Sequence, residues 1–208
     1  MGWYDEHVLP FVLDWQLSRP PFPEQRRKVQ AGLAGTGLEI GFGSGLSLPH
    51  YPSGPGGVTR LSVLDPSPGM LRRARSRLAA APFPVDVLPF HPDRPYPLAD
   101  GSVDWVLSEL TLCTVPDVAA VLAEVRRVLR PGGRYRFFEH GAAEEPGWLR
   151  WQRRLTPLQR RIGGGCCFDR PIAALVRAAG FAAVDVERVR LPRIPKLMGR
   201  LYIGTAVA

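Results

Sequence analysis

The stretch Gly37-Leu38-Glu39-Ile40-Gly41-Phe42-Gly43-Ser44-Gly45 decides how this chain folds. Its apolar first half is typical of a buried strand, and the strand runs directly into a turn with glycine at every second position. Glycine adopts positive φ without strain and leaves the backbone bare, so a ligand can lie against the main chain of such a turn. A second apolar run, residues 61–64, ends at Asp65. Together the glycine turn and the acid predict a nucleoside-cofactor site.

The glycine spacing and one acid narrow the choice of cofactor. The spacing is G-x-G-x-G, whereas a dinucleotide-binding turn would place its third glycine where Leu46 stands. No Gly-Lys-Ser/Thr follows, which argues against a phosphate-binding P-loop. Glu39 lies inside the strand, where an acid is costly unless it serves a cationic group. The pattern therefore favours a nucleoside cofactor that carries a positive charge.

The rest of the chain alternates short apolar runs with amphipathic segments, which predicts an α/β fold. We expect a Rossmann-like, doubly wound, seven-stranded and mostly parallel sheet in a single domain. Strands are expected at residues 37–40, 59–64, 85–88, 103–107, 134–139, 181–189 and 201–206, and helices at 4–17, 26–33, 118–129, 148–162, 171–179 and from about 68. The domain divides into an N-terminal helical cap (1–33), a cofactor-binding core (34–140), a lid and acceptor region (141–170), and a closing helix and strands (171–208).

Two of these helices carry further expectations about packing and capping. In the first helix, Val8, Phe11, Val12 and Trp15 share one face, which we expect to pack over the domain. Asp169 is expected to cap the helix that follows it.

Composition limits the setting of the protein. The 208 residues carry a net charge of +8, and only Lys28 and Lys196 among the 27 basic residues are lysines, which favours coding bias over a polyanionic partner. Cys113, Cys166 and Cys167 are too few for a disulfide scaffold, and without a CxxC pair or a histidine cluster we expect no metal site. The sequence shows no secretory signal pattern and no membrane-spanning run, so we expect a reduced, cytoplasmic setting.

Four motifs, in order, resemble those of the class I S-adenosylmethionine-dependent methyltransferases of the type 11-like group. They are residues 39–45, 63–67 (Val-Leu-Asp-Pro-Ser), 98–104 (Leu-Ala-Asp-Gly-Ser-Val-Asp) and 124–133 (Glu-Val-Arg-Arg-Val-Leu-Arg-Pro-Gly-Gly). The resemblance covers roughly residues 36–140. It implies S-adenosylmethionine as the cofactor and transfer of its methyl group as the reaction.

The resemblance also implies a role for each matched residue. Glu39 would interact with the ammonium group of the cofactor, partly through water. The glycine turn would lie close to the methionine carboxylate and the ribose of the cofactor. Asp65 would accept from both ribose hydroxyls, the alternative being an acid that caps the next helix. Many members have an adenine-binding acid where an ungapped alignment places Pro92, and Asp93 is the neighbouring candidate. The full predicted set is Glu39, Gly41, Phe42, Gly43, Gly45, Asp65, Pro66, Met70, Asp93 and Ser108.

Groups that face the methyl acceptor should follow the fourth and fifth strands, because ligands bind beyond the carboxyl ends of such strands. His140 is the candidate catalytic base, since imidazole titrates near neutral pH. The alternative is a structural histidine bonded to a loop carbonyl. Cys113 is interpreted as a packing or pocket-lining residue rather than a nucleophile, because the sequence offers it no evident base partner.

A narrower resemblance is to small-molecule thiol methyltransferases associated with the endoplasmic reticulum and lipid droplets, and to small bacterial relatives, some called phospholipid N-methyltransferases. It rests on residues 112–115, 138–140, 148–152 and 165–170. The membrane-bound members carry an N-terminal hydrophobic anchor, which this sequence does not show. The resemblance implies a small, lipophilic acceptor with a thiol, amine or hydroxyl group. A thiol would ask little of a base, because it is partly thiolate at neutral pH.

The predicted helix from Trp148 to Ile162 has a mixed character. Its apolar stripe is accompanied by five arginines on other faces; the stripe consists of Trp148, Trp151, Leu155, Leu158 and Ile162. Such a helix either packs on the core as a lid or lies on an anionic membrane. We expect the packed lid, bent at Pro157, with peripheral membrane contact as the alternative.

Two other functions compete with methylation of a small-molecule acceptor. A nucleic-acid methyltransferase is suggested by the positive charge alone, and neither an Asn/Asp-Pro-Pro-Tyr/Phe motif nor an added RNA-binding module is present, so we expect no nucleic-acid partner. A non-catalytic S-adenosylmethionine-binding module would use the same fold.

Overall fold

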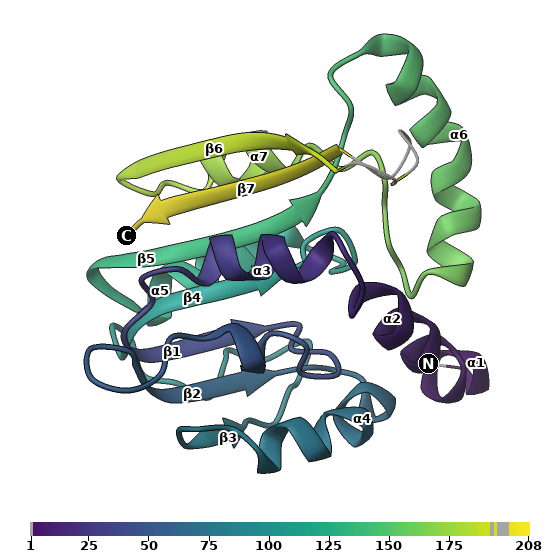
Figure 1. Cartoon of the computed structure of the whole chain (residues 1–208). Coiled ribbons are helices and arrows are strands. Elements are labelled where there is room, and N and C mark those ends of the chain that lie inside the picture. Colours follow the sequence, from purple (N-terminus) through teal and green to yellow (C-terminus); the bar gives the residue numbers. More distant parts are fainter. Residues whose placement is uncertain (1, 192–193, 195–199) are drawn as a thin grey trace.

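The computed structural model describes residues 2–191, 194 and 200–208, and its centre is one seven-stranded sheet. The strands are β1 (Gly35–Ile40), β2 (Val58–Leu64), β3 (Val85–Val87), β4 (Val103–Glu109), β5 (Leu129–His140), β6 (Ala183–Arg190) and β7 (Arg200–Val207). Their order is β3-β2-β1-β4-β5-β7-β6 (Figure 1). Neighbours from β3 to β5 are parallel, whereas β7 runs antiparallel to β5 and β6. The predicted Rossmann-like, mostly parallel sheet in a single domain is confirmed.

Helices cover both faces of this sheet. They are α1 (Trp3–His7), α2 (Leu9–Leu17), α3 (Phe22–Gln30), α4 (Pro68–Ala79), α5 (Val118–Val128), α6 (Pro146–Ile162) and α7 (Ile172–Ala178), with the 3-10 helix η1 (Leu48–His50). Leu122 of α5 and Ile172 of α7 belong to one hydrophobic core. Val29 of α3 and Ala74 of α4 belong to a second core. Strand side chains alternate between the two cores, so a helical layer on each face is needed to bury them.

The carboxyl ends of the central strands form one edge of the sheet. Ile40 at the end of β1 pairs with Ser108 of β4, and Glu109 pairs with Phe138 of β5. The glycine turn, the segment after β4 and His140 therefore lie at the same edge. Helices α1, α2 and α6 lie beyond it, to the right of the sheet in Figure 1. Open parallel sheets bind their ligands at this edge.

The N-terminal helix differs from the prediction in two ways. It is split into α1 and α2 at Val8, because Pro10 stands in the first turn of α2. The face expected to pack over the domain is largely exposed, at Phe11, Val12 and Trp15. Asp14 faces inward instead and pairs with Arg73 and Arg77 of α4. These ion pairs fix the rotation of α2 and turn its aromatic side outward.

Helix α6 buries only part of its apolar stripe: Leu155 packs against a small buried cluster and Trp148 is partly buried, whereas the other three residues of the stripe face solvent. Trp151, Leu158 and Ile162 are all more than half exposed. The buried side of α6 is polar: Gln152 accepts from the Ala143 N–H at 2.7 Å. No helix in the described ranges is both long and apolar enough to cross a lipid bilayer.

The predicted cap at Asp169 is wrong as well. Pro171 occupies the N-cap position of α7, and no side-chain cap forms there. The Asp169 carboxylate instead accepts from the Thr156 hydroxyl of α6 at 2.8 Å. This acid ties α6 to the following segment, a contact between distant residues that local helix signals cannot reveal.

Candidate active site

The glycine turn after β1 has the backbone conformation that its sequence requires. Gly41, Gly43 and Gly45 have φ values of 67°, 61° and 76°, in the left-handed region where other residues are strained. A Cβ atom added at Gly41 would lie 2.1 Å from Thr111 Oγ1. At Gly43 the nearest atom to such a Cβ would be 3.9 Å away, so this side of the turn is open. The turn therefore has one packed side and one side bare enough for a ligand to approach.

The N–H groups of the three glycines already have partners. Gly41 donates to the Leu64 carbonyl, Gly45 to the Phe42 carbonyl, and Gly43 to Asp65 Oδ2 at 2.7 Å. The bonds of Gly41 and Gly43 hold the turn to the end of β2, whereas that of Gly45 closes the turn on itself.

Asp65 braces the turn against the start of α4. Besides the Gly43 N–H, its carboxylate accepts from the Ser67 N–H at 2.8 Å. Burial raises its pKa, and the two backbone hydrogen bonds oppose that rise. The capping role considered for Asp65 belongs to Ser67, whose hydroxyl accepts from the Met70 N–H. Asp65 thereby stands at the end of β2 beside the bare face of the turn.

Glu39 is a buried acid held from one side. Ser47 and Tyr51 both donate hydroxyl hydrogen bonds to its Oε2, at 2.7 and 2.8 Å. Within the described ranges Oε1 accepts no hydrogen bond from the protein. Burial, with the charge of nearby Glu109 added, raises the pKa of Glu39 to about 8. A cationic ligand beside Oε1 would favour the charged carboxylate.

The other predicted cofactor residues occupy varied positions. The Phe42 side chain is in the core, Pro66 and Asp93 are exposed, and Met70 is partly buried. The Ser108 hydroxyl is fully buried and bonds to Tyr135 and to Glu139, so its position does not support the predicted contact with the cofactor.

The chain's own residues fit S-adenosylmethionine. The bare face at Gly43 admits a ligand. Glu39 would offer a carboxylate oxygen to an ammonium group, and Asp65 would offer a carboxylate at the end of β2, where a ribose would lie.

Glu139, which precedes His140 at the end of the fifth strand, has a role that the sequence did not predict. Its Oε1 accepts from the Ser108 hydroxyl and from the N–H groups of Thr111 and Leu112, at 2.8 to 3.0 Å. Its Oε2 is buried and has no hydrogen-bond partner among the described residues, and burial raises the pKa of the Glu139 carboxyl group to about 7. Glu139 therefore positions the segment after β4. An acid inside an apolar strand was the signal, the same one that singled out Glu39.

The backbone leaves β4 through a strained residue. Leu110 has a φ of 55°, the only positive φ of a residue other than glycine in the described part of the chain. Such conformations persist where the surroundings enforce them. Here Glu139 holds the next two N–H groups, and the turn directs Cys113 toward His140.

A second missed feature is a buried ion pair at the same edge. Arg26 of α3 donates to Glu109 Oε2 at 2.9 Å, and both side chains are about 5% exposed. Gln30 donates to the other carboxylate oxygen, and Arg26 also reaches the Leu17 carbonyl. The pair fixes the N-terminal helices over the end of β4.

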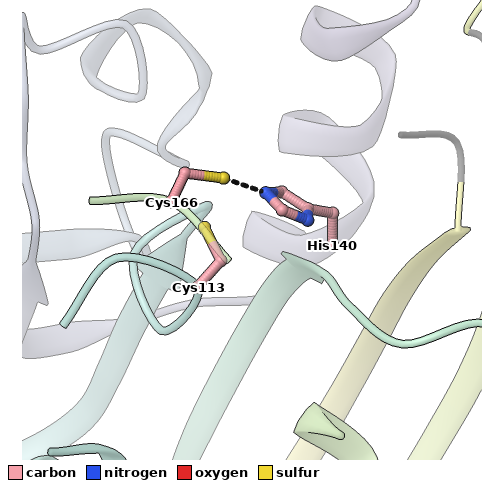
Figure 2. A group of neighbouring side chains, drawn as sticks. All are labelled: Cys113, His140 and Cys166. Carbon is pink, nitrogen blue, oxygen red and sulfur yellow. Dashed lines mark hydrogen bonds between the residues drawn. The ribbon is translucent and has the colours of Figure 1, made fainter. Parts of the chain in front are cut away.

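His140 lies beside two cysteines rather than a loop carbonyl. Its Nε2 is 2.8 Å from Cys166 Sγ, and its ring contacts that of Phe168. A ligand atom of each of Cys113, His140 and Cys166 lies within 4.8 Å of those of the other two. Figure 2 shows these side chains converging from the segment after β4, the end of β5 and the segment after α6. We call this group the Cys113–His140–Cys166 cluster.

The cluster shifts the protonation of its members. The neighbouring thiol of Cys113, helped by His140, lowers the pKa of Cys166 to about 5 despite burial. The proximity of Cys166, with burial, raises the pKa of Cys113. Burial lowers the pKa of His140, but the contact with Cys166 outweighs it, so the net shift is upward. No metal site was expected because the candidate ligands are not closely spaced in the sequence; the fold gathers these three across 53 positions, from residue 113 to residue 166.

Comparison with known proteins identifies the class. A family model described as "Methyltransferase domain" matches residues 38–137. A solved S-adenosylmethionine-dependent methyltransferase from Thermotoga maritima has the same fold, with a TM-score of 0.68 at 20% identity over 98% of this chain and 97% of that one.

Curated relatives carry the assignment further. Human thiol S-methyltransferase TMT1B is 36% identical over 172 residues, 78% of this chain and 68% of the human protein. Phosphatidylethanolamine N-methyltransferase from Cereibacter sphaeroides is 30% identical over 144 residues, 66% of this chain and 68% of that protein. The chain belongs to the S-adenosylmethionine-dependent methyltransferases, and it is an enzyme of that family.

Proposed function

We propose that this enzyme methylates the sulfur of a small, lipophilic thiol. The observation that carries the proposal is the Cys113–His140–Cys166 cluster at the carboxyl ends of β4 and β5, where the acceptor of a class I methyltransferase would lie. The similarity to a human thiol S-methyltransferase supports the same acceptor class. An amine acceptor is the second candidate, because a phosphatidylethanolamine N-methyltransferase is also a relative.

The residues would divide the work between binding and methyl transfer. S-adenosylmethionine supplies a methyl group activated by a sulfonium. Glu39 and Asp65 would hold the cofactor through its ammonium group and ribose, with the glycine turn lying against it. His140 would contact the acceptor, and Glu139 would keep the segment after β4 in place. The acceptor must present an unprotonated sulfur in line with the methyl group.

Methyl transfer from radiolabelled S-adenosylmethionine tests the acceptor class. The acceptors compared are alkyl thiols, phosphatidylethanolamine, small phenols and RNA. We expect the highest kcat/KM with an alkyl thiol. Transfer to phosphatidylethanolamine or to RNA alone would reject the thiol proposal. Binding of S-adenosylhomocysteine without transfer to any acceptor would indicate a non-catalytic binding module.

Calorimetric titration with S-adenosylhomocysteine tests the cofactor residues. We expect Asp65→Ala to weaken binding by about 1–3 kcal/mol, because a buried acceptor of hydrogen bonds is removed. Asp93→Ala tests the proposed contact with the adenine amino group and should have a smaller effect, since Asp93 is exposed. An unchanged dissociation constant for Asp65→Ala would refute its ribose role.

We also propose that α1, α2 and α6 touch an anionic membrane surface. The Tyr4 hydroxyl of α1 donates to the Ile162 carbonyl of α6, which joins the helices into one surface. Its exposed apolar side chains are Trp3 (72%), Phe11 (56%), Trp15 (53%), Trp151 (54%), Leu158 (57%) and Ile162 (51%). Five exposed arginines lie on α6, at positions 150, 153, 154, 160 and 161. Aromatic groups next to arginines are the combination that anionic lipid interfaces bind.

Sedimentation with vesicles tests this surface. We expect binding to vesicles of phosphatidylglycerol and phosphatidylcholine, weakened by salt, and little binding to phosphatidylcholine alone. The double variant Trp151→Ser/Ile162→Ser should bind at least about tenfold more weakly, since each large apolar side chain contributes about 1.5–3 kcal/mol when buried. Val87→Ser, an exposed apolar residue on β3, is the matched control and should bind like the wild type. Equal binding by both variants would reject the membrane proposal.

A further inference from the structure

The Cys113–His140–Cys166 cluster has the composition of a metal site with one open position. Two thiols and one imidazole converge, with all three ligand atoms within 4.8 Å of one another. Cys₂His is a ligand set that catalytic zinc sites use, and in such sites the fourth position is left to water or substrate. Two thiolates and a neutral imidazole would balance the charge of Zn²⁺, so the site with zinc and no acceptor would be neutral where Cys113 and Cys166 are buried.

We propose that Cys113, His140 and Cys166 bind one Zn²⁺ through their two sulfur atoms and an imidazole nitrogen, and that the acceptor thiol occupies the fourth position as a thiolate. This inference rests on the proposed thiol acceptor. It assigns His140 the role of a metal ligand, so the metal rather than an imidazole base keeps the acceptor sulfur unprotonated.

The segments that supply the ligands are tied to one another directly. The Cys167 N–H donates to the Cys113 carbonyl at 2.8 Å, which links the segment after α6 to the segment after β4. Arg170 donates to the carbonyls of Leu112 and Val115, on either side of Cys113. Glu139, next to His140 in the chain, binds the N–H group of Leu112. These bonds hold the three ligands in place independently of a metal, and outer contacts of this kind orient the ligands of metal sites.

Methyl transfer would proceed from S-adenosylmethionine to the zinc-bound acceptor thiolate. The acceptor R–SH binds the metal and releases its proton to water. Its sulfur then attacks the methyl carbon of S-adenosylmethionine, forming a new S–CH₃ bond while the bond from methyl to the sulfonium sulfur breaks. The electron pair of that bond stays on the departing sulfur, which gives neutral S-adenosylhomocysteine. The product is a thioether, which binds zinc more weakly than a thiolate and can leave.

Metal content tests the site separately from activity. The full chain, purified with a reductant, is mixed with Zn²⁺, freed of excess metal and analysed by inductively coupled plasma mass spectrometry. We expect about one zinc per chain, lost in Cys113→Ser, in Cys166→Ser and in His140→Gln. Cys167→Ser is the matched control and should keep its zinc, because Cys167 is adjacent to the cluster but not among its ligands. Stabilisation by S-adenosylhomocysteine verifies that each variant is folded.

Cobalt substitution tests what the metal does. In the Co²⁺ protein we expect thiolate charge-transfer bands that change when an alkyl thiol is added and stay unchanged with an alkyl alcohol. Removing the metal with a chelator should lower thiol methylation at least about tenfold and leave the affinity for S-adenosylhomocysteine unaltered.

Each alternative result has a definite meaning. Absence of stoichiometric zinc, or zinc retained equally in the serine variants, overturns the metal site. If thiols are still methylated in that case, the proposed function stands alone. A Cys113–Cys166 disulfide in non-reducing mass spectrometry of the zinc-treated protein also overturns it. Zinc without any thiol methylation would instead reject the proposed function and the catalytic role of the metal.

Discussion

Replacing Glu39 by glutamine should make the protein without cofactor more stable at alkaline pH. Burial and Glu109 raise the pKa of Glu39 from 4.5 to about 8. Between these values the unfolded chain gives up its proton while the folded protein keeps it, so the free energy of unfolding falls as pH rises. At about 1.4 kcal/mol per pH unit, the loss over this window is about 5 kcal/mol. The introduced glutamine does not titrate, and it keeps an oxygen for the hydroxyls of Ser47 and Tyr51.

Urea unfolding followed by tryptophan fluorescence, from about pH 5 to about pH 9, measures this difference. We expect wild type and Glu39→Gln to agree near pH 5 and to diverge by several kcal/mol near pH 9, with the variant more stable. Glu109 and Glu139 are present in both proteins, so most of their effect cancels in the comparison. Curves that stay parallel across the whole range would refute the assignment of a raised pKa to Glu39.

The same change has an opposite consequence for ligand binding. An ammonium group beside the Glu39 carboxylate favours its charged form, so binding of S-adenosylhomocysteine to the wild type should tighten as pH rises toward about 8. Glu39→Gln should bind more weakly and should lose this part of the pH dependence. Isothermal titration at several pH values measures both effects. If Glu39 is kept buried in order to bind the ligand, Glu39→Gln should be more stable than the wild type and should bind S-adenosylhomocysteine more weakly.

Two further comparisons use variants in pairs. Arg26→Ala leaves the buried carboxylate of Glu109 without its cation and should lower the free energy of unfolding by about 3–5 kcal/mol. Arg60→Ala breaks an exposed ion pair and should lower it by less than about 1 kcal/mol. Equal losses for the two variants in urea unfolding would contradict this difference. Gly41→Ala should lower the melting temperature far more than Gly43→Ala, because only the former adds an atom against Thr111. Gly43→Ala should mainly weaken S-adenosylhomocysteine binding. Equal losses of melting temperature in the two variants would contradict the predicted clash at Gly41.

The fold was predictable where sequence periodicity and local signals agree. The glycine turn at 41–45 and the start of α4 at Pro68 follow directly from their residues. The end of α5 was predicted one residue late, because β5 already begins at Leu129 and includes the Pro-Gly-Gly segment expected only to stop the helix. Periodicity alone does not show which side of a helix faces the core. In α2 the ion pairs of Asp14 decided that, and in α6 the hydrogen bonds of Gln152 did.

The two halves of the proposed site, one for the cofactor and one for the acceptor, differ in how much the sequence reveals. The cofactor side is concentrated in residues 39–45 and Asp65, so its pattern can be recognised locally. The acceptor side is assembled from segments that are distant in the chain, and no spacing rule connects Cys113 with Cys166. His140 could be named from its place after a strand, but its sulfur neighbours could not. Long-range contacts created by the fold, such as those from Arg170 to the Leu112 and Val115 carbonyls, bring them together.

The acids at the acceptor edge bear on which acceptor this enzyme can use. Glu109 is paired with Arg26, Glu139 holds the backbone after β4, and Glu39 faces the cofactor side with two hydroxyls bound. Glu109 is therefore neutralised by its ion pair, and the one oxygen of Glu139 that no described residue contacts is buried, so neither acid presents a free carboxylate oxygen to an acceptor. An amine arrives protonated and an alcohol holds its proton far above neutral pH, so both would need such a base. A thiol needs only a cationic neighbour to become thiolate, and the metal that we propose at the cluster of His140 would be that neighbour. The absence of a free carboxylate base among these acids and the presence of two cysteines beside His140 thus both favour a thiol acceptor.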